Sequence, residues 1–192
     1  MKYLLACFLF FFNSSAFSQV NVIVQWNPVT ASDATDTIYY NLAQKLDWND
    51  FKGKPQTRSI AAAITASGYG YGMTMQTRNN KTNIIINVYC FFNKNNSWVK
   101  PGMKIDYALT HEQHHFDITY IHACRFVRKL RAAAFTRNNY EELLNQINDE
   151  TYAELEKMQN DYDGQTKNGQ LKDAQYAWNK KIDDILSTMV TK

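Results

Sequence analysis

The sequence predicts an α+β fold in which a small antiparallel sheet comes first and a helical half follows. Two patterns support this prediction. Ile84, Ile86, Val88 and Cys90 fall on one face of residues 82–92, which is typical of a strand with one buried side. Beyond residues 101–102 apolar residues recur every three or four positions, as in amphipathic helices. The length of 192 residues suits one domain.

The first half of the chain contains the predicted strands. Residues 20–26 are expected to form a strand that Pro28 ends, and a short helix is expected at residues 39–46. After turn-rich residues, a second strand is expected to start at residue 60 and to bend at the alternating glycines of residues 68–72. Asn79 and Asn80 then make the turn of a hairpin that leads into residues 82–92.

The second half contains three predicted helices. The first follows residue 102 and ends near residue 134, and the second runs from residue 140 to about 162. Gly164 and Gly169 are expected to break the second helix. The third helix covers residues 171–189, and its inner face carries Ala174, Trp178, Ile182 and Ile185.

Residues 1–18 have the pattern of a signal peptide. Lys2 is followed by an apolar run over residues 4–12 and by small residues that end at Ser18, where cleavage is expected. The run is too short to span a bilayer, and no other segment approaches about 20 apolar residues. We therefore expect residues 19–192 to be a single domain that is exported to the periplasm or the extracellular space, with no membrane span.

The net charge argues against nucleic acid as a partner, and the cysteine content does not decide between a disulfide and free thiols. Loss of Lys2 with the signal peptide lowers the net charge from +3 to +2, which argues against a nucleic-acid surface. Cys90 and Cys124 remain after cleavage, and both a disulfide and free thiols fit the sequence. Nothing in the sequence indicates an oligomeric state. A solvated helix face is the expected place of the basic cluster Arg125, Arg128, Lys129 and Arg131.

All four histidines lie between positions 111 and 122, and residues 111–115 form an H-E-x-x-H motif. Positions i and i+4 of a helix share one face, so His111 and His115 can bind one zinc ion. Glu112 stands beside them as the general base that takes a proton from zinc-bound water. The alternative is a chance motif on a polar helix face. The H-E-x-x-H motif lies on a strongly periodic predicted helix, as zinc binding requires, and this favours the zinc site over a chance motif.

A catalytic zinc ion needs a third protein ligand. If the first two helices pack antiparallel about a turn near residues 136–138, residues 111–115 lie opposite residues 159–163. Asp161 and Asp163 are the carboxylates at that level, and helix geometry leaves both open. A solvated helix face is the expected place of three further acidic residues: Glu150, Glu154 and Glu156.

The other histidines are poor candidate ligands. His114 lies off the ligand face, and His122 is too far along the helix axis from His111. A metzincin site needs a histidine six residues after His115, where this chain has Ile121. That class of metallopeptidase is therefore excluded.

Several spaced segments resemble the family named domain of unknown function 922, whose members are predicted secreted zinc-dependent proteases. The matching segments are residues 46–55, Ser97-Trp98, residues 109–118 and residues 162–166, followed by Gln175 and Trp178. The resemblance implies an exported, zincin-like protease domain whose site includes His111, Glu112 and His115. It also favours Asp163 over Asp161 as the third ligand, because Tyr162-Asp163 is the matching pair.

One position departs from the family pattern. The family commonly has a histidine before the glycine where this chain has Asn168-Gly169, which implies weakened activity if that histidine is essential. Asn168 and Tyr162 are candidate hydrogen-bond donors to an oxyanion.

The function that follows is that of a secreted zinc metallopeptidase, which hydrolyses peptide or protein substrates by means of zinc-activated water. One alternative is a non-catalytic envelope binding module that keeps zinc, or only the motif; another is hydrolysis of a non-peptide bond. The intact Glu112 favours catalysis. Trp48, Trp98 and Trp178 could bind substrate, but core packing is the favoured interpretation for all three.

Overall fold

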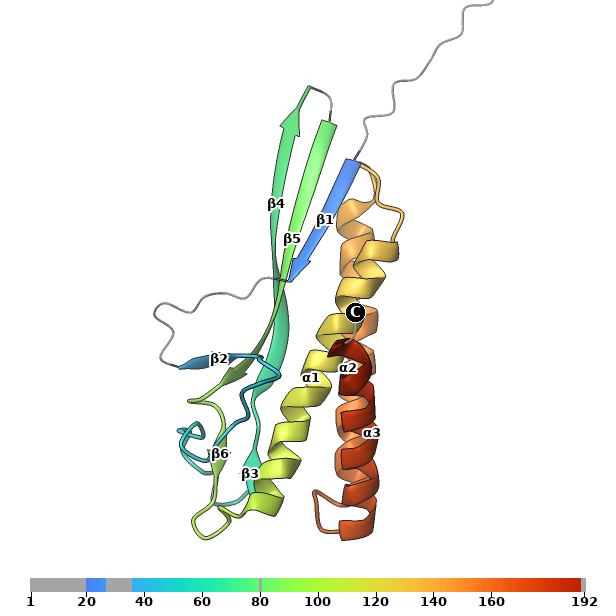
Figure 1. Cartoon of the computed structure of the whole chain (residues 1–192). Coiled ribbons are helices and arrows are strands. Elements are labelled where there is room, and N and C mark those ends of the chain that lie inside the picture. Colours follow the sequence, from blue (N-terminus) through green and yellow to red (C-terminus); the bar gives the residue numbers. More distant parts are fainter. Residues whose placement is uncertain (1–19, 27–35, 80, 191–192) are drawn as a thin grey trace, which may run out of the picture.

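The computed structural model describes residues 20–26, 36–79 and 81–190 (Figure 1). The predicted signal peptide lies outside these residues. The fold is α+β, as predicted: a small sheet is followed by three helices. Within the described residues, no helix has the length and apolar character needed to cross a membrane.

The main sheet is built around its longest strand, β5 (Lys81–Asn93). β4 (Ser67–Arg78) pairs with it in antiparallel fashion, and so does the short β2 (Thr37–Tyr39). β1 (Val20–Trp26) instead runs parallel to β5, so the sheet is mixed and not wholly antiparallel as expected. No hairpin joins β1 to β5, and only a hairpin would have forced the two strands to run in opposite directions.

The alternation in β5 is confirmed. Every even-numbered residue from Thr82 to Phe92 is buried, because this face of the strand turns toward the helices. The hairpin between β4 and β5 is also confirmed, and Asn79 has the left-handed backbone (φ 50°) that a tight turn needs. Asn80, the other expected turn residue, lies outside the described residues.

The predicted bent strand is instead two strands in two sheets. β3 (Ala63–Ile64) pairs with β6 (Trp98–Val99), while β4 begins at Ser67 in the main sheet. Between them the backbone N–H of Ala66 donates to the side-chain Ser97 Oγ (2.9 Å) and not to a backbone oxygen, so the strand pairing is interrupted there. Within β4, a Cβ at Gly70 would meet the Tyr89 ring at 2.8 Å, which explains the glycine there.

The prediction of a short helix at residues 39–46 is wrong. The Tyr40 N–H donates to Cys90 O (2.9 Å), which continues the β2 pairing, and the Leu46 N–H donates to Gln113 Oε1 (2.8 Å). The Tyr40 ring stacks on Tyr120 with centroids 4.0 Å apart. These contacts to the sheet and to the first helix replace the local hydrogen bonds of a helix.

The three predicted helices are confirmed as α1 (Asp106–Ala132), α2 (Tyr140–Thr166) and α3 (Lys172–Val190). Gly164 does not break α2, because one glycine costs a helix only about 1 kcal/mol and its neighbours Tyr162 and Thr166 are fully buried. The helix ends where Lys167, Asn168 and Gly169 all take positive φ values of 48°, 52° and 77°.

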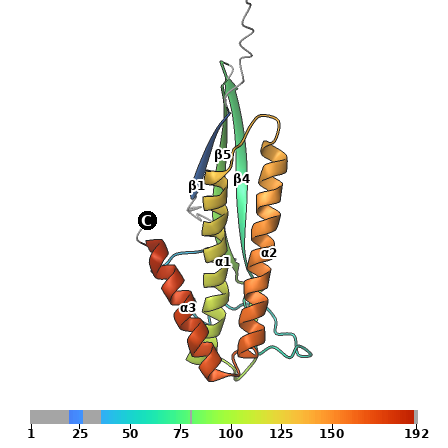
Figure 2. The same ribbon diagram turned by 90° about the vertical axis from the view of Figure 1, so that its right-hand side faces the viewer.

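α1 lies against the sheet, with α2 on one side of it and α3 on the other (Figures 1 and 2). Because α1 faces all three neighbours, its buried residues point in every direction and include His111, Glu112, Gln113 and His114 in succession. The H-E-x-x-H motif is therefore held by packing on all sides of one helix.

The tryptophans and cysteines have structural surroundings. Trp98 and Trp178 are buried, Trp48 packs on Phe51 with centroids 4.9 Å apart, and the core-packing interpretation is confirmed. Cys90 is a buried thiol and Cys124 a half-buried one, and the two are not joined by a disulfide.

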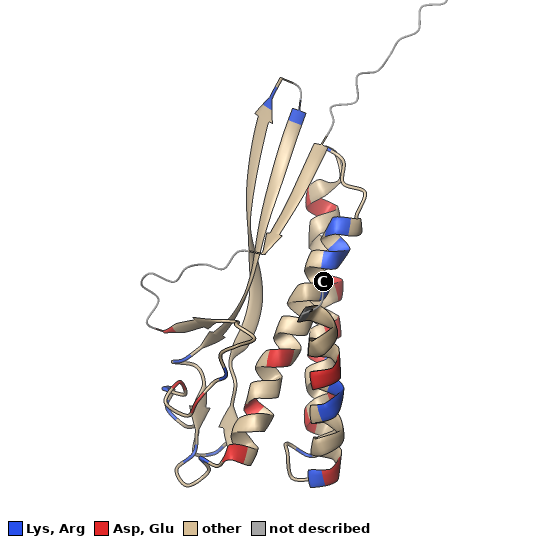
Figure 3. Ribbon diagram, in the orientation of Figure 1, with Lys and Arg blue, Asp and Glu red and all other residues tan. Residues whose placement is uncertain are grey.

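Acidic and basic residues are mixed along the helices (Figure 3). Of the basic cluster on α1, Lys129 pairs with Glu154 (2.9 Å) and Glu150 (3.9 Å) on α2, and Arg131 donates to Val24 O (3.2 Å) on β1. The cluster is therefore partly solvated, as expected, and partly used to join α1 to its neighbours.

Candidate metal centre

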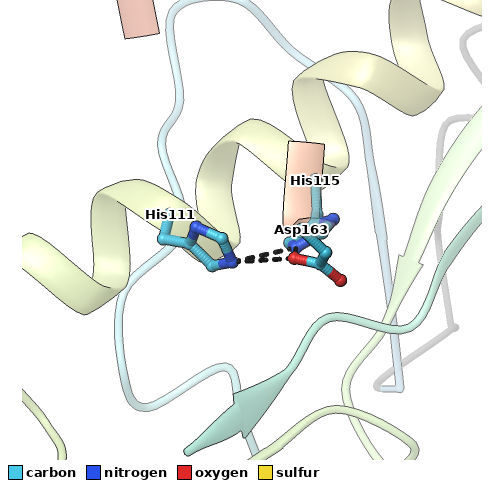
Figure 4. A group of neighbouring side chains, drawn as sticks. All are labelled: His111, His115 and Asp163. Carbon is cyan, nitrogen blue, oxygen red and sulfur yellow. Dashed lines mark hydrogen bonds and ion pairs between the residues drawn. The ribbon is translucent and has the colours of Figure 1, made fainter. Parts of the chain in front are cut away.

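The antiparallel packing of α1 and α2 brings residues 111–115 level with residues 159–163, since Gln159 contacts His115 and Asp163 contacts both histidines. His111 and His115 project from one face of α1 and meet Asp163 of α2 (Figure 4). Asp163 Oδ1 lies 3.2 Å from His111 Nε2 and 3.1 Å from His115 Nε2, and the two Nε2 atoms are 3.2 Å apart. These three residues form a group that could hold a metal ion.

The spacing of the three atoms fits a zinc ion. Ligand atoms at 2.0–2.1 Å from a tetrahedral zinc ion are separated from one another by roughly 3.3 Å. The three observed separations of 3.1 to 3.2 Å are close to that value. Small outward movements would place the three atoms at three corners of a tetrahedron.

Two glutamines orient the histidine rings. Gln175 Oε1 lies 2.8 Å from His111 Nδ1, and Gln159 Oε1 lies 2.5 Å from His115 Nδ1. A carbonyl oxygen only accepts hydrogen bonds, so each Nδ1 carries the proton. Each Nε2 therefore faces the common centre, where it donates to Asp163 when the ring is protonated and offers an electron pair to a metal ion when it is not.

The orientation of both amide groups is set by their nitrogen atoms. Gln175 Nε2 donates to the Tyr162 hydroxyl (2.5 Å) and to Asn179 Oδ1 (2.6 Å). Gln159 Nε2 donates to His115 O (2.9 Å) and to Thr119 Oγ1 (3.3 Å). A flip of either amide would turn an oxygen toward these acceptors. The carbonyl oxygens must therefore face the histidines.

The centre favours positive charge. Burial alone would raise the pKa of Asp163, but hydrogen bonds from His111 and His115 hold that pKa far below its ordinary value. Burial alone would lower the pKa of His115, but its bond to Asp163 and the nearby charge of Glu112 raise it. Both shifts show that the group stabilises a positive charge at its centre, which a proton on a histidine or a bound metal ion can supply.

Glu112 is held by a residue that the sequence did not indicate. The Thr65 hydroxyl donates to Glu112 Oε2 (2.7 Å) and lies 3.1 Å from Glu112 O. Thr65 directly follows β3, so the small sheet fixes the orientation of a carboxylate that is only 5% exposed. No local pattern marks this threonine, because its partner lies 47 positions later in the chain.

These residues lie in an open cleft with a volume of about 700 Å³. One wall comes from residues 60–65 and the beginning of α1, and the other comes from α2 and the turn after it. His111, Glu112, His115 and Asp163 all line this cleft, and so does Glu156, which was expected only on a solvated face. A ligand can therefore reach the candidate metal centre.

The remaining predicted candidates lie elsewhere. Asp161 pairs with Lys157 (2.6 Å) on its own helix, so Asp163, and not Asp161, meets the histidines. His122 donates from Nδ1 to Ile118 O (2.9 Å) and accepts from Arg125 (3.0 Å), in agreement with its exclusion as a ligand. Burial lowers the pKa of His122.

His114 belongs to a second buried network on the back of α1. Its Nδ1 lies 3.1 Å from Asp117, which is fully buried and also accepts from the Tyr40 hydroxyl (2.7 Å) and Gln113 Nε2 (2.8 Å). Although burial would raise the pKa of Asp117, these hydrogen bonds lower it. The network ties α1 to the segment after β2 and takes no part in the candidate metal centre.

The two expected oxyanion donors differ. The Tyr162 hydroxyl donates to His111 O (3.3 Å) and accepts from Gln175, so it is occupied within the protein, which argues against that role. Its ring stacks on His111 with centroids 4.6 Å apart, and burial raises its pKa. Asn168 is exposed and lines the cleft, and its backbone N–H donates to Asp163 O (2.8 Å).

Two histidines one turn apart, an aspartate from the neighbouring helix and a buried glutamate define a candidate metal centre of the H-E-x-x-H type. Residues 99–170 match the family described as bacterial protein of unknown function (DUF922), which confirms the resemblance to that family. This range includes the three candidate ligands and Glu112. The resembling residues 46–55, Gln175 and Trp178 lie outside it. The comparisons found no matching curated protein and no matching solved structure.

Proposed function

We propose that this chain is an exported zinc-dependent hydrolase that cleaves peptide bonds. In this proposal His111, His115 and Asp163 hold the zinc ion, and Glu112 is the general base. The observation that carries the proposal is the meeting of three electron-pair donors within 3.2 Å of one another in an open cleft. Export rests on the composition of residues 1–18.

A zinc ion in this group would supply a Lewis acid that makes a bound water easier to deprotonate. The other steps belong to the chain. Glu112 takes the proton of the attacking water and later delivers it to the leaving amine. Thr65 holds Oε2 of Glu112, so the carboxylate keeps one orientation during both transfers. Gln159 and Gln175 keep the histidine electron pairs on the centre.

Two features favour a catalytic site over a structural one. A structural zinc ion has four protein ligands, whereas this group would supply three, all of which line the cleft. A structural site also has no use for a buried carboxylate beside the ligands. Asn168, at the position where the family commonly has a histidine, is the one residue that favours a non-catalytic binding module.

The test is the zinc content of the purified mature protein, measured by elemental analysis after dialysis against a weak chelator. Wild type is expected to hold about one zinc ion per chain, because residues 20–26, 36–79 and 81–190 offer one three-ligand group. His111→Ala is expected to lose the zinc and Asp163→Ala to hold it weakly. Asp161→Ala is the matched control and should retain it, because Asp161 pairs with Lys157.

Peptide cleavage by the zinc-loaded protein is the second measurement, with Glu112→Gln as the inactive control. Loss of the general base should lower kcat by roughly 10²- to 10⁴-fold at unchanged zinc content. Failure of folded wild type to bind supplied zinc would leave a module that only retains the motif. Zinc binding without cleavage of any peptide would leave the zinc-containing binding module as the better account.

A further inference from the structure

The exposed apolar side chains of this protein gather at the candidate metal centre. The described part of the chain has ten exposed large hydrophobic residues, and half of them line the cleft that contains the candidate metal centre. These five are Ile60, Ile64, Met103, Ile105 and Tyr152. Ile60 is 96% exposed, although contact of its apolar side chain with water is unfavourable in free energy. Clustered apolar exposure of this kind marks a binding surface.

Four of the five residues form one wall, which we call the apolar wall: Ile60, Ile64, Met103 and Ile105. Backbone bonds hold its two segments together. β3 pairs with β6, and the Lys100 N–H donates to Ala62 O (2.8 Å). The Met103 N–H donates to Lys100 O (3.1 Å), and Ile105 is the N-cap residue of α1. The wall is thus a fixed surface joined to the helix that carries the histidines.

The opposite wall has a different character. It comes from α2 and presents Glu156, Gln159 and Asn160 to the cleft, together with Asp163 at the candidate metal centre. Tyr152 and Leu155 of α2 also line the cleft, so this wall is mixed. A chain lying in the cleft would therefore meet the continuous apolar wall on one side and a mixed, largely polar surface on the other. Burial of apolar surface against the apolar wall would lower the binding free energy only of substrates that place a large apolar side chain there.

We propose that the apolar wall selects peptides with a large aliphatic or aromatic side chain close to the bond that is cleaved. The proposal rests on the proposed function, and it names the substrate class of the same site. Substitution of a polar residue for such a side chain is expected to lower kcat/KM by on the order of ten- to a hundredfold, the range typical of hydrophobic pockets.

Cleavage of a peptide mixture by the zinc-loaded protein, followed by mass spectrometry of the products, gives the preference directly. The matched variants are Met103→Ser and Met73→Ser, because both methionines are 41% exposed and only Met103 lines the cleft. Met103→Ser is expected to lower kcat/KM about tenfold for a leucine-containing peptide and much less for its alanine counterpart. Met73→Ser should leave both values unchanged, and both variants should keep the wild-type zinc content.

Binding to the inactive Glu112→Gln protein provides a readout without turnover. The leucine peptide should bind more tightly than its serine counterpart, and Met103→Ser should remove that difference. Cleavage without an apolar preference, or equal effects of Met103→Ser and Met73→Ser, would overturn the apolar wall and leave the proposed function standing. Absence of any cleavage by zinc-loaded wild type would overturn the proposed function, and this proposal with it.

Discussion

Each candidate histidine ligand takes its orientation from one glutamine, and the two glutamines come from different helices. Gln159 of α2 accepts from His115, and Gln175 of α3 accepts from His111. A neutral amide fixes the ring and the tautomer without adding charge to a centre that already contains Asp163. The three helices therefore all contribute to one small group of atoms.

Replacement of Gln159 by leucine tests this role. Gln159→Leu removes the acceptor for His115 Nδ1, so the ring can turn or change tautomer, and zinc affinity should fall roughly 10- to 100-fold. Competition with a chromophoric chelator measures the change. Gln146→Leu is the control on the same helix, since Gln146 is exposed and bonds only to Glu150 among the contacts described. Equal zinc affinity of the two variants would contradict the role of Gln159.

The sequence revealed the histidines but not the residues that orient them. His111 and His115 are recognisable because two residues four positions apart on a helix lie on the same face, one turn from each other. Gln159, Gln175 and Thr65 act through partners more than 40 positions away, which no local pattern encodes. One sign was available: Gln175 precedes Trp178 and Ile182 at helical spacing, so a polar residue occupies a core position of α3.

At the scale of elements, the turn between α2 and α3 bears on the candidate metal centre. Gly169 has a φ of 77°, and a Cβ there would lie 3.4 Å from His111 Nδ1 and 3.7 Å from Gln175 Oε1. The Tyr107 hydroxyl also donates to Gly169 O (2.7 Å), which ties the turn to α1. The turn therefore closes over the hydrogen bond that orients His111.

A pair of glycine variants separates backbone strain from crowding at the centre. Gly169→Val and Gly102→Val both force a branched side chain into a left-handed backbone (φ 77° and 80°) and should each lose on the order of 1–3 kcal/mol of stability. Only Gly169→Val should also weaken zinc binding, by about tenfold, because Gly102 faces open space. Denaturant unfolding and zinc titration measure the two effects. An undiminished zinc affinity in Gly169→Val would show that the turn does not support His111.

Elements were predictable from the sequence where their pattern was long, and they were missed where distant contacts decided the backbone. β5 and the three helices have clear periods and were expected at nearly the observed positions. The segment at residues 39–46 has helical composition, but β5 and Gln113 bind its backbone. The parallel direction of β1 likewise depends on pairing with a strand far along the chain.

For the whole molecule, a metal ion held at the candidate metal centre would link α1 to α2. A metal ion that binds the folded chain and not the unfolded one stabilises the fold by mass action. At a free zinc concentration of one hundred times Kd the gain is about 2.7 kcal/mol. For a chain of this size that gain should raise Tm by roughly 5–10 °C.

Thermal unfolding with and without zinc measures this effect. His115→Ala should show no zinc-dependent rise in Tm, because one of the two histidine ligands is missing. Asp161→Ala should show the wild-type rise, since Asp161 lies outside the group. A rise that persists in His115→Ala would place the stabilising zinc ion elsewhere in the molecule.

The parallel pairing of β1 with β5 has a consequence for the order in which the chain can fold. β4 and β5 meet across a tight turn, whereas Val20 pairs with Thr82 and Trp26 pairs with Val88. Closing so long a loop is entropically costlier and slower than closing a hairpin. A polypeptide that emerges N-terminus first, from a ribosome or through a membrane, therefore carries β1 without its partner until β5 has followed it.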